Sequence, residues 1–508
     1  MNAKSRLKLF IAVIAIAVCV VCLFSLVGHG MLVKRSDASG QRVALRDFPY
    51  PYSAMAALVN DCDNTTLRAF ERYHRFLNTR EQTIYGAGLG LDISDSFFCY
   101  TAASDYSSVM TYFQGADPNV LKDAGRIERY VRCGWIDALH TYGDFSAPQE
   151  QEQEQTQAHL FSRDLAAAAF LALKNIGIFP IIWSDHGNEG NVQNFGSYGL
   201  GSSARYKHGD DAFAKEYYHS DITLLGGVKY IWDPKQNSRF GYDFPLAAKT
   251  LRDGRKVWAF SRYTSGSGGG GSGGSGGSGG GGGSGGSADS YNGGGSGGEG
   301  GYDRSAGAVG PTWDWYPDRL RYVLTEEHLS DLADKRQYGL FAQHLGYYGE
   351  DYIYDAEDIA ALRRLADFQH ERREVLVARA SRLLEYATAR EFVAYSVYAS
   401  IDGAPSTNAL SYQKNSNDTQ TFQAFQTYQA YIDITSIDDP LFFDGAPSLD
   451  RARGLTFYCD DPDRVTILLR GAPLDDSDIS RNPPDETGRP SISINWFEPD
   501  TRDYSYFG

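Results

Sequence analysis

Two aspartates two positions apart form the sharpest chemical signal in the sequence. Asp61 and Asp63 lie in Asn60-Asp61-Cys62-Asp63-Asn64, directly after the apolar run Met55–Val59. Residues two apart in an extended segment face the same side, and two carboxylates this close need a counter-ion or a shared proton. We therefore expect a divalent metal, with one carboxylate as ligand and the other as base. The alternative reading is a strand-end turn rich in Asp and Asn.

Three histidines follow other apolar runs in the same way. His140 and Asp144 lie four apart after Trp135–Leu139, a spacing at which both side chains can reach one ion if the chain turns. The segment 181–188, Ile-Ile-Trp-Ser-Asp-His-Gly-Asn, repeats the arrangement with His186, and His344 ends a late strand. A single histidine is more often structural than a ligand. Because α/β folds gather the carboxyl ends of their strands at one edge, the repeated placement predicts one shared site.

The elements that must position these residues alternate between strand and helix. The pattern suits a parallel α/β sheet or barrel, and about seven βα units predict a distorted (β/α)7-type barrel. The expected strands and helices are Met55–Val59, Leu67–Leu77, Thr83–Ile93, Val120–Arg132, Trp135–Leu139, Asp164–Asn175, Ile178–Trp183, Val228–Trp232, Val257–Phe260, Tyr338–Ala342, Ala356–Phe368 and Glu371–Tyr386. After about Ala389, short strands with Asp/Pro/Gly turns predict a small antiparallel β domain. Its expected strands are Tyr431–Thr435, Leu455–Tyr458, Val465–Leu469 and Ser491–Trp496.

Composition and the first residues bound the location and the partners. With 48 Lys+Arg against 64 Asp+Glu, the 508-residue chain carries a net charge of -16, which argues against a general nucleic-acid binder. Basic residues precede the apolar run Leu9–Val27, which is long enough for a membrane span. We expect an uncleaved anchor, or alternatively a long signal peptide, with the remainder outside the cytoplasm, on the periplasmic side of the inner membrane if the host is bacterial.

The predicted organisation has four parts. Residues 1–35 form the anchor or signal, 45–388 the barrel and 389–508 the β-rich domain, while 265–301 is a flexible Gly/Ser-rich insertion in the barrel. Four cysteines lie beyond the first apolar run and lack the close pairs of a zinc knuckle, so buried thiols or one or two disulfides are expected. They are Cys62, Cys99, Cys133 and Cys459.

The order of these motifs resembles that of the polysaccharide deacetylase family, in the glycoside hydrolase/deacetylase barrel superfamily. That family carries T-F-D-D-G after its first strand, H-[ST]-x-x-H after a later one and a leucine-x-histidine near the last. Here Asn60–Asn64, His140–Asp144 and Phe341–Leu345 stand in the corresponding places, within Tyr52–Tyr386. The segments Gly90–Phe97, Tyr218–Asp221 and Leu251–Gly254 are similar to those of uncharacterised exported members.

The resemblance implies a role for each matching residue. Asp63 and His140 would hold a metal, with Asp144 in place of the family's second histidine; Asp61 would be the general base, and His344 the acid that protonates the leaving group. Cys62 separates two aspartates that are adjacent in the family. A ligand set poor in histidine would shift preference from zinc to oxygen-loving divalent ions. Residues expected near substrate or behind the ligands are Asp92, Asp95, Trp183, Asp185, His186 and His219.

The resulting hypothesis is an extracytoplasmic, metal-dependent enzyme that removes N- or O-acyl groups from a polysaccharide or oligosaccharide. Two alternatives stay open. A glycoside hydrolase would use paired carboxylates drawn from Asp61, Asp63, Asp185 and Glu189. A catalytically degenerate barrel would bind glycan in an envelope polysaccharide assembly, keeping its aromatic residues but no metal.

Overall fold

The computed structural model describes residues 43–102, 108–145, 161–186, 191–196, 207–233, 239–263, 316–400, 429–442 and 446–497. The predicted anchor 1–35 and the Gly/Ser tract 265–301 lie outside these ranges. Among the helices that are described, none has the length and apolar character needed to cross a membrane.

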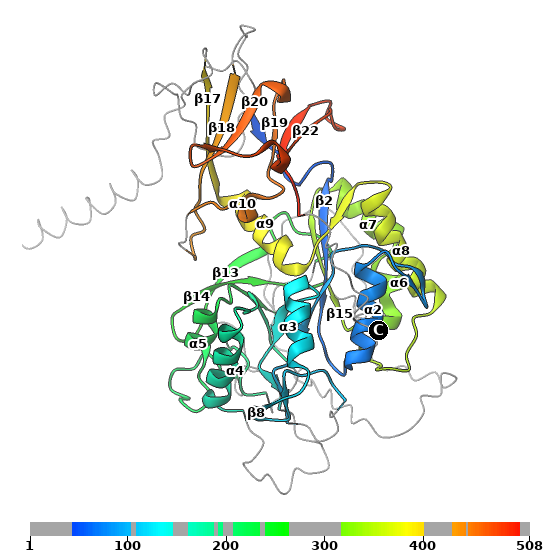
Figure 1. The fold of residues 1–508 in the computed structure, drawn as a ribbon, viewed down its shortest axis with the longest axis vertical. Coiled ribbons are helices and arrows are strands. Elements are labelled where there is room, and N and C mark those ends of the chain that lie inside the picture. The colour runs from blue at the N-terminus through cyan, green and yellow to red at the C-terminus, as the bar shows by residue number, and fades with distance from the viewer. Residues whose placement is uncertain are drawn as a thin grey trace, which may run out of the picture.

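A curled sheet forms the centre of a mixed α/β fold (Figure 1). Its order is β13-β14-β12-β11-β9-β5-β2-β15, and β16 also pairs with β2; all neighbours are parallel except β13 and β14. Tyr263, just beyond β14, makes an isolated parallel bridge with Phe341 of β15, so the chain after β14 reaches β15 across the curl. The strands are β2 (Ala54–Asn60), β5 (Ser94–Phe97), β9 (Ile136–His140), β11 (Ile182–Ser184), β12 (Tyr230–Trp232), β13 (Leu246–Thr250), β14 (Lys256–Phe260), β15 (Tyr338–Gln343) and β16 (Val375–Val377).

Helices cover the outer face of this sheet. Ala54, Ala56 and Leu58 of β2 pack there in one core with the apolar sides of the helices. The first helix begins where the Thr66 hydroxyl accepts a hydrogen bond from the Ala69 amide, a typical N-cap. These helices are α2 (Leu67–Asn78), α3 (Ala124–Cys133), α4 (Arg163–Asn175), α5 (Ser220–Gly226), α6 (Leu320–Val323), α7 (Glu326–Asp334) and α8 (Ala356–His370).

The inner face of the curl packs on one helix and on the C-terminal part of the chain. Met55, Ala57 and Val59 alternate with the outward residues of β2 and share a second core with Leu383 and Leu384 of α9 (Ala380–Phe392). The same core continues into the C-terminal strands, which lie beyond α9 in Figure 1. Sheet, helix and C-terminal region are therefore held by shared apolar burial.

Two four-stranded sheets make up the C-terminal region, and every pairing in them is antiparallel except that of β18 with β20. The strands are β17 (Val393–Ser400), β18 (Gln429–Ile437), β20 (Val465–Leu469) and β21 (Ala472–Pro473) in one sheet, and β1 (Ala44–Leu45), β19 (Thr456–Tyr458), β23 (Ser491–Ile494) and β22 (Ile479–Asn482) in the other. Residues from the start of the described chain thus complete a C-terminal sheet.

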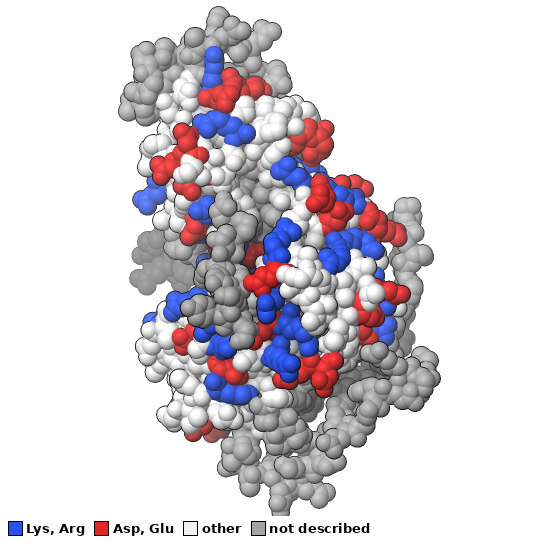
Figure 2. Space-filling view, turned by 45° about the vertical axis from the view of Figure 1, so that its right-hand side comes forward, with Lys and Arg blue, Asp and Glu red and all other residues white. Residues whose placement is uncertain are grey.

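Short elements fill the connections. They are β3 (Gln82–Thr83), β4 (Gly86–Ala87), β6 (Tyr100–Thr101), β7 (Phe113–Gln114), β8 (Asp117–Leu121), β10 (Gly143–Asp144), α10 (Leu449–Ala452) and the 3-10 turns η4 (Pro317–Arg319), η5 (Pro462–Arg464) and η6 (Asp476–Asp478). Cys62, Cys99, Cys133 and Cys459 are buried free thiols, the first of the two predicted alternatives. On the described face seen in Figure 2, basic and acidic side chains are interspersed.

Two expected elements were wrong. The run Glu371–Tyr386, predicted as one helix, contains strand β16 followed by α9. The run Thr83–Ile93 contains only the two-residue strands β3 and β4, and the sheet strand β5 begins just after it at Ser94. In both cases the strands have only two or three residues, too few to show their own period in the sequence.

The shared inner core generates a stability prediction. Leu383 on α9 is fully buried, so Leu383→Ala should lower the free energy of unfolding by about 2 to 5 kcal/mol through lost transfer energy and a new cavity. Leu171→Ala is the matched control: Leu171 is 56% exposed on α4, and its loss should change stability by about 0.5 kcal/mol or less. Urea unfolding measures both variants. Equal effects would contradict the placing of α9 in the core.

Candidate functional site

Alternation along the strands carries one layer of polar side chains to the inner face of the curl. The last inward-facing apolar residues of several strands, among them Val59, Ala138, Ile182 and Phe260, belong to the inner core. Residues two positions further on face the same way. They are Asp61, His140, Ser184 and Arg262, and His344 lies four positions beyond the inward Leu340.

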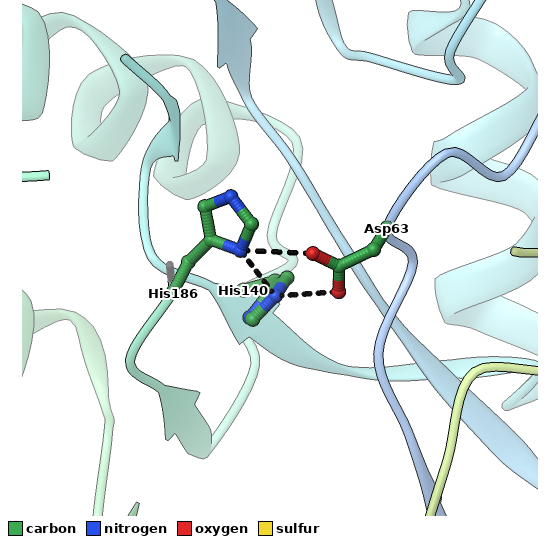
Figure 3. A group of neighbouring side chains, drawn as sticks. All are labelled: Asp63, His140 and His186. Carbon is green, nitrogen blue, oxygen red and sulfur yellow. Dashed lines mark hydrogen bonds and ion pairs between the residues drawn. The ribbon is translucent and has the colours of Figure 1, made fainter. Parts of the chain in front are cut away.

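Asp63 is the centre of this layer (Figure 3). One of its carboxylate oxygens lies 3.0 Å from His140 Nε2 and the other 3.0 Å from His186 Nδ1. The two ring nitrogens are themselves 3.0 Å apart. His344 Nε2 approaches from β15, 3.1 Å from Asp63 Oδ2. Strand ends far apart in sequence therefore meet on one carboxylate.

The donor set of Asp63, His140 and His186 fits one divalent ion. The two imidazole nitrogens lie 3.0 Å apart and each lies 3.0 Å from a different oxygen of Asp63, separations short enough for ligands that each lie about 2.0 to 2.2 Å from a common ion. All three ligand atoms lie within 4.8 Å of one another, as do those of Asp61, Asp63 and His344. Two imidazoles and one carboxylate suit zinc and other first-row transition metals, so this set is richer in nitrogen than the sequence predicted.

The charge on Asp63 is strongly favoured. Burial alone would raise the pKa of this carboxyl, but His140, His186 and His344 hold its pKa well below the usual value. Conversely, burial lowers the pKa of His186, while Asp63 and Asp144 more than offset that effect and raise it well above the usual value. Without an ion, His186 is the imidazole whose charged form is favoured beside Asp63.

Asp61 has different partners from Asp63. Arg262 Nη1 donates to Asp61 Oδ2 at 2.7 Å, and the Ser184 hydroxyl donates to Oδ1 at 3.1 Å. Burial would raise the pKa of Asp61, but Arg262, His140 and His344 bring it below the usual value. The Arg262 guanidinium also lies 4.0 Å from the centre of the Trp232 ring, a cation–π contact that fixes its direction. Asp61 is thus an ionised, well-oriented carboxylate beside the ligand group.

Asp144 lies behind the ligands. Its Oδ1 is 3.4 Å from His186 Nε2, the ring nitrogen that points away from Asp63. The ligand position that the sequence analysis gave to Asp144 is taken by His186, which comes from the next strand. A carboxylate against the far nitrogen of a ligand histidine orients the ring and raises its basicity.

Aromatic and backbone features shape the surroundings. Phe98 stacks on His140 with ring centres 4.9 Å apart and meets His186 edge-on at 5.0 Å. Asn64 and Thr141, directly after Asp63 and His140, have φ angles of 54° and 53°, left-handed conformations that are costly outside glycine.

Burial raises the pKa of the Cys62 thiol well above its usual value, with nearby Asp95 and Asp63 adding to the shift. This thiol is therefore no candidate nucleophile.

Asp95 lies beside the site in a buried network. Asn60 Nδ2 donates to Asp95 Oδ2 at 2.6 Å, the Tyr73 hydroxyl donates to the same oxygen, and burial raises the pKa of Asp95 well above its usual value. Asn60 Oδ1 in turn accepts from the amide of Leu345 at 2.8 Å. Asp95 and Asn60 thus fix the backbone next to His344.

Four other predicted residues are structural. The Trp183 indole donates to Asp185 Oδ1 at 2.9 Å, and Lys207 Nζ pairs with Asp185 Oδ2 at 2.8 Å. His219 is fully buried between Thr223 Oγ1 and the Gln193 carbonyl. Asp92 lies before β5, at the opposite end of the strand from the site, and pairs with Arg379 and Arg382.

Sequence reasoning missed Arg262 and Ser184. Both lie at ends of strands that were predicted, Val257–Phe260 and Ile178–Trp183. Extending the two-residue alternation past Phe260 and Ile182 would have placed both side chains on the inner face.

Comparison of the chain with family models, with curated proteins and with solved structures finds no match.

The contact of Asp144 with His186 predicts an effect on metal affinity. Asp144→Asn keeps the shape but removes the charge that orients the ligand ring, and should weaken binding of added Zn²⁺ by about 10- to 100-fold. Asp92→Asn, at the far end of the strand, should leave affinity unchanged. Competition with a chromophoric chelator measures both. An unaltered Asp144→Asn affinity would show that Asp144 does not support the ligand.

His219 predicts a pH dependence of stability. Burial lowers its pKa from 6.5 to about 4, so the unfolded chain binds more protons than the folded chain between these values. Stability from this group is present above pH 6.5 and is lost as the pH falls towards 4. His219→Gln should flatten that slope by up to about 1.4 kcal/mol per pH unit. Urea unfolding at several pH values tests this, and parallel slopes for the two proteins would contradict it.

Proposed function

We propose that the protein is a metal-dependent hydrolase that removes acyl groups from a carbohydrate, as a polysaccharide N- or O-deacetylase does. The observation that supports this most is the convergence of Asp63, His140 and His186, with Asp61 and His344 beside them. It joins a metal-binding triad to two further groups able to move protons. The sequence resemblance to the deacetylase family points the same way.

The ion would be held by Asp63, His140 and His186, and when bound it would act as a Lewis acid towards the acyl oxygen and the attacking water. Asp61 accepts the proton of that water, in the orientation fixed by Arg262 and Ser184. His344 donates a proton through Nε2 to the departing amine or alcohol, since this nitrogen is the one directed at the carboxylate pair. Phe98 keeps water from one side of the ligand rings.

A glycoside hydrolase receives less support. Asp61 and Asp63 both direct an oxygen at the same nitrogen of His344, at 3.9 and 3.1 Å, whereas a glycosidase pair flanks the bond between two sugars. Asp185 is held by Lys207 and Trp183. Glu189, the fourth carboxylate of that alternative, lies outside the described residues.

We place this activity outside the cytoplasm, with the chain anchored through the apolar run 9–27. The support is the sequence pattern alone: three basic residues before a long apolar segment. Whether that segment is an anchor or a cleaved signal is decided by the N-terminal sequence of the mature protein.

Acetate release from acetylated oligosaccharides by the full-length chain tests the proposal. Activity should disappear with chelator and return with a divalent ion. His186→Ala should lose both metal and activity, whereas His344→Gln should keep the metal and lose about 10²- to 10⁴-fold in kcat, the usual share of a general acid. Asp92→Asn is the matched control. Full metal content and full activity in His186→Ala would refute the proposed site.

A further inference from the structure

A chain of tyrosine rings extends from His344 towards the protein surface. The His344 and Tyr347 rings meet edge-on, with centres 6.0 Å apart. Tyr347 contacts Tyr316 at 4.9 Å and Tyr348 at 5.7 Å, and Tyr348 contacts Tyr352 at 4.9 Å. We call Tyr316, Tyr347, Tyr348 and Tyr352 the tyrosine ladder.

The ladder differs from the tyrosines of the core in its exposure. Tyr348 is 41% exposed and its neighbour Ile353 is 57% exposed, whereas Tyr354, which continues the series inward, is 3% exposed. Tyr316 and Tyr348 stack nearly parallel, with 20° between their planes. A ring with one edge exposed to solvent and one face packed against its neighbours is suited to binding a ligand rather than to core packing.

The loop that carries Tyr347, Tyr348 and Tyr352 is held in place by residues outside it. Arg72 on α2 donates to the carbonyls of Tyr352 at 2.6 Å and Gly349 at 3.3 Å, and also to that of Glu350. A Cβ at Gly346 would lie 2.3 Å from Thr65 Oγ1, so the loop passes too close to Thr65 for any side chain there. Such fixed backbone lowers the entropy cost of binding.

Charge around the ladder limits its ligand. The segments 316–322 and 345–358 contain no lysine and two arginines, Arg319 and Arg321, against six acidic residues: Asp318, Glu350, Asp351, Asp355, Glu357 and Asp358. Arg321 pairs with three of these carboxylates. Arg68 and Arg72 of α2 also contact this loop, so six carboxylates face four guanidinium groups. A polymer of uronic acids or one bearing phosphate would meet net negative charge here.

We propose that the tyrosine ladder is a sugar-stacking platform for a neutral or amino-sugar polysaccharide, leading towards His344. The C–H face of a sugar ring is attracted to the negative face of an aromatic ring, and tyrosine offers this contact with little loss of side-chain freedom. The inference rests on the proposed function only for what happens at the site; binding by the ladder needs no turnover.

Equilibrium binding of unacylated hexasaccharides to the full-length chain tests the platform, because these probes have no acyl group to lose. Cellohexaose and the β-1,4-linked glucosamine hexamer should bind, and the galacturonic acid hexamer should not. Tyr348→Ala should weaken binding of the first two about five- to ten-fold, and Tyr348→Phe, which keeps the ring, less than two-fold. Phe213→Ala removes a ring that is 96% exposed and lies outside the ladder, and should change nothing.

Failure of the two proposals can be told apart. Equal affinity in Tyr348→Ala and wild type, tighter binding of the galacturonic hexamer, or no binding of either of the other two would overturn the platform. Acetate release would be unaffected by those results. Conversely, Tyr348-dependent binding without acetate release would keep the platform and remove the hydrolase.

Discussion

The concentration of charge on Asp63 is the constraint that the site depends on. A buried carboxylate costs free energy unless it is paired, and Asp63 meets this need with three imidazoles brought by β9, β11 and β15. These strands can deliver them only because the sheet curls, which points their inward side chains at a common axis. The curl in turn depends on α9, whose leucines fill the inner face below the polar layer. Apolar packing at one end of the strands thus sets the geometry of ligands at the other.

The two aspartates are two residues apart yet are set to different tasks by their partners. Asp61 faces a guanidinium and a hydroxyl, while Asp63 faces imidazole nitrogens. A permanent cation already balances Asp61, so a metal gains more from Asp63, whose imidazole partners are themselves metal ligands in their neutral form. Two titratable groups that lie close together but have different surroundings, as Asp61 and Asp63 do, are typical of acid/base sites.

Much of the site could be predicted from the sequence because the ends of the strands can be recognised in it. Short apolar runs followed by polar residues located Asp61, Asp63, His140, His186 and His344, and the parallel arrangement required them to meet. What the sequence could not give was which groups touch. A spacing of four within one segment favoured Asp144 as partner of His140, but His186, 46 residues further on, lies closer to the ion position because β11 is the neighbouring strand. Local spacing says nothing about register between strands.

The same limit explains the missing parts of the fold. β16 has three residues, too short to show a period, and β1 joins the C-terminal sheet through a pairing more than 400 residues away in sequence, Ala44 with Tyr458. Buried arginines illustrate it in another way. Arg262 reads in the sequence as an ordinary surface residue, yet it is 6% exposed, and burial of such a charge is tolerated only with a partner. Asp61 is that partner, and each of the two buried charges is stabilised by the other. A buried, inward-facing arginine at the end of a strand therefore indicates that a carboxylate lies near it.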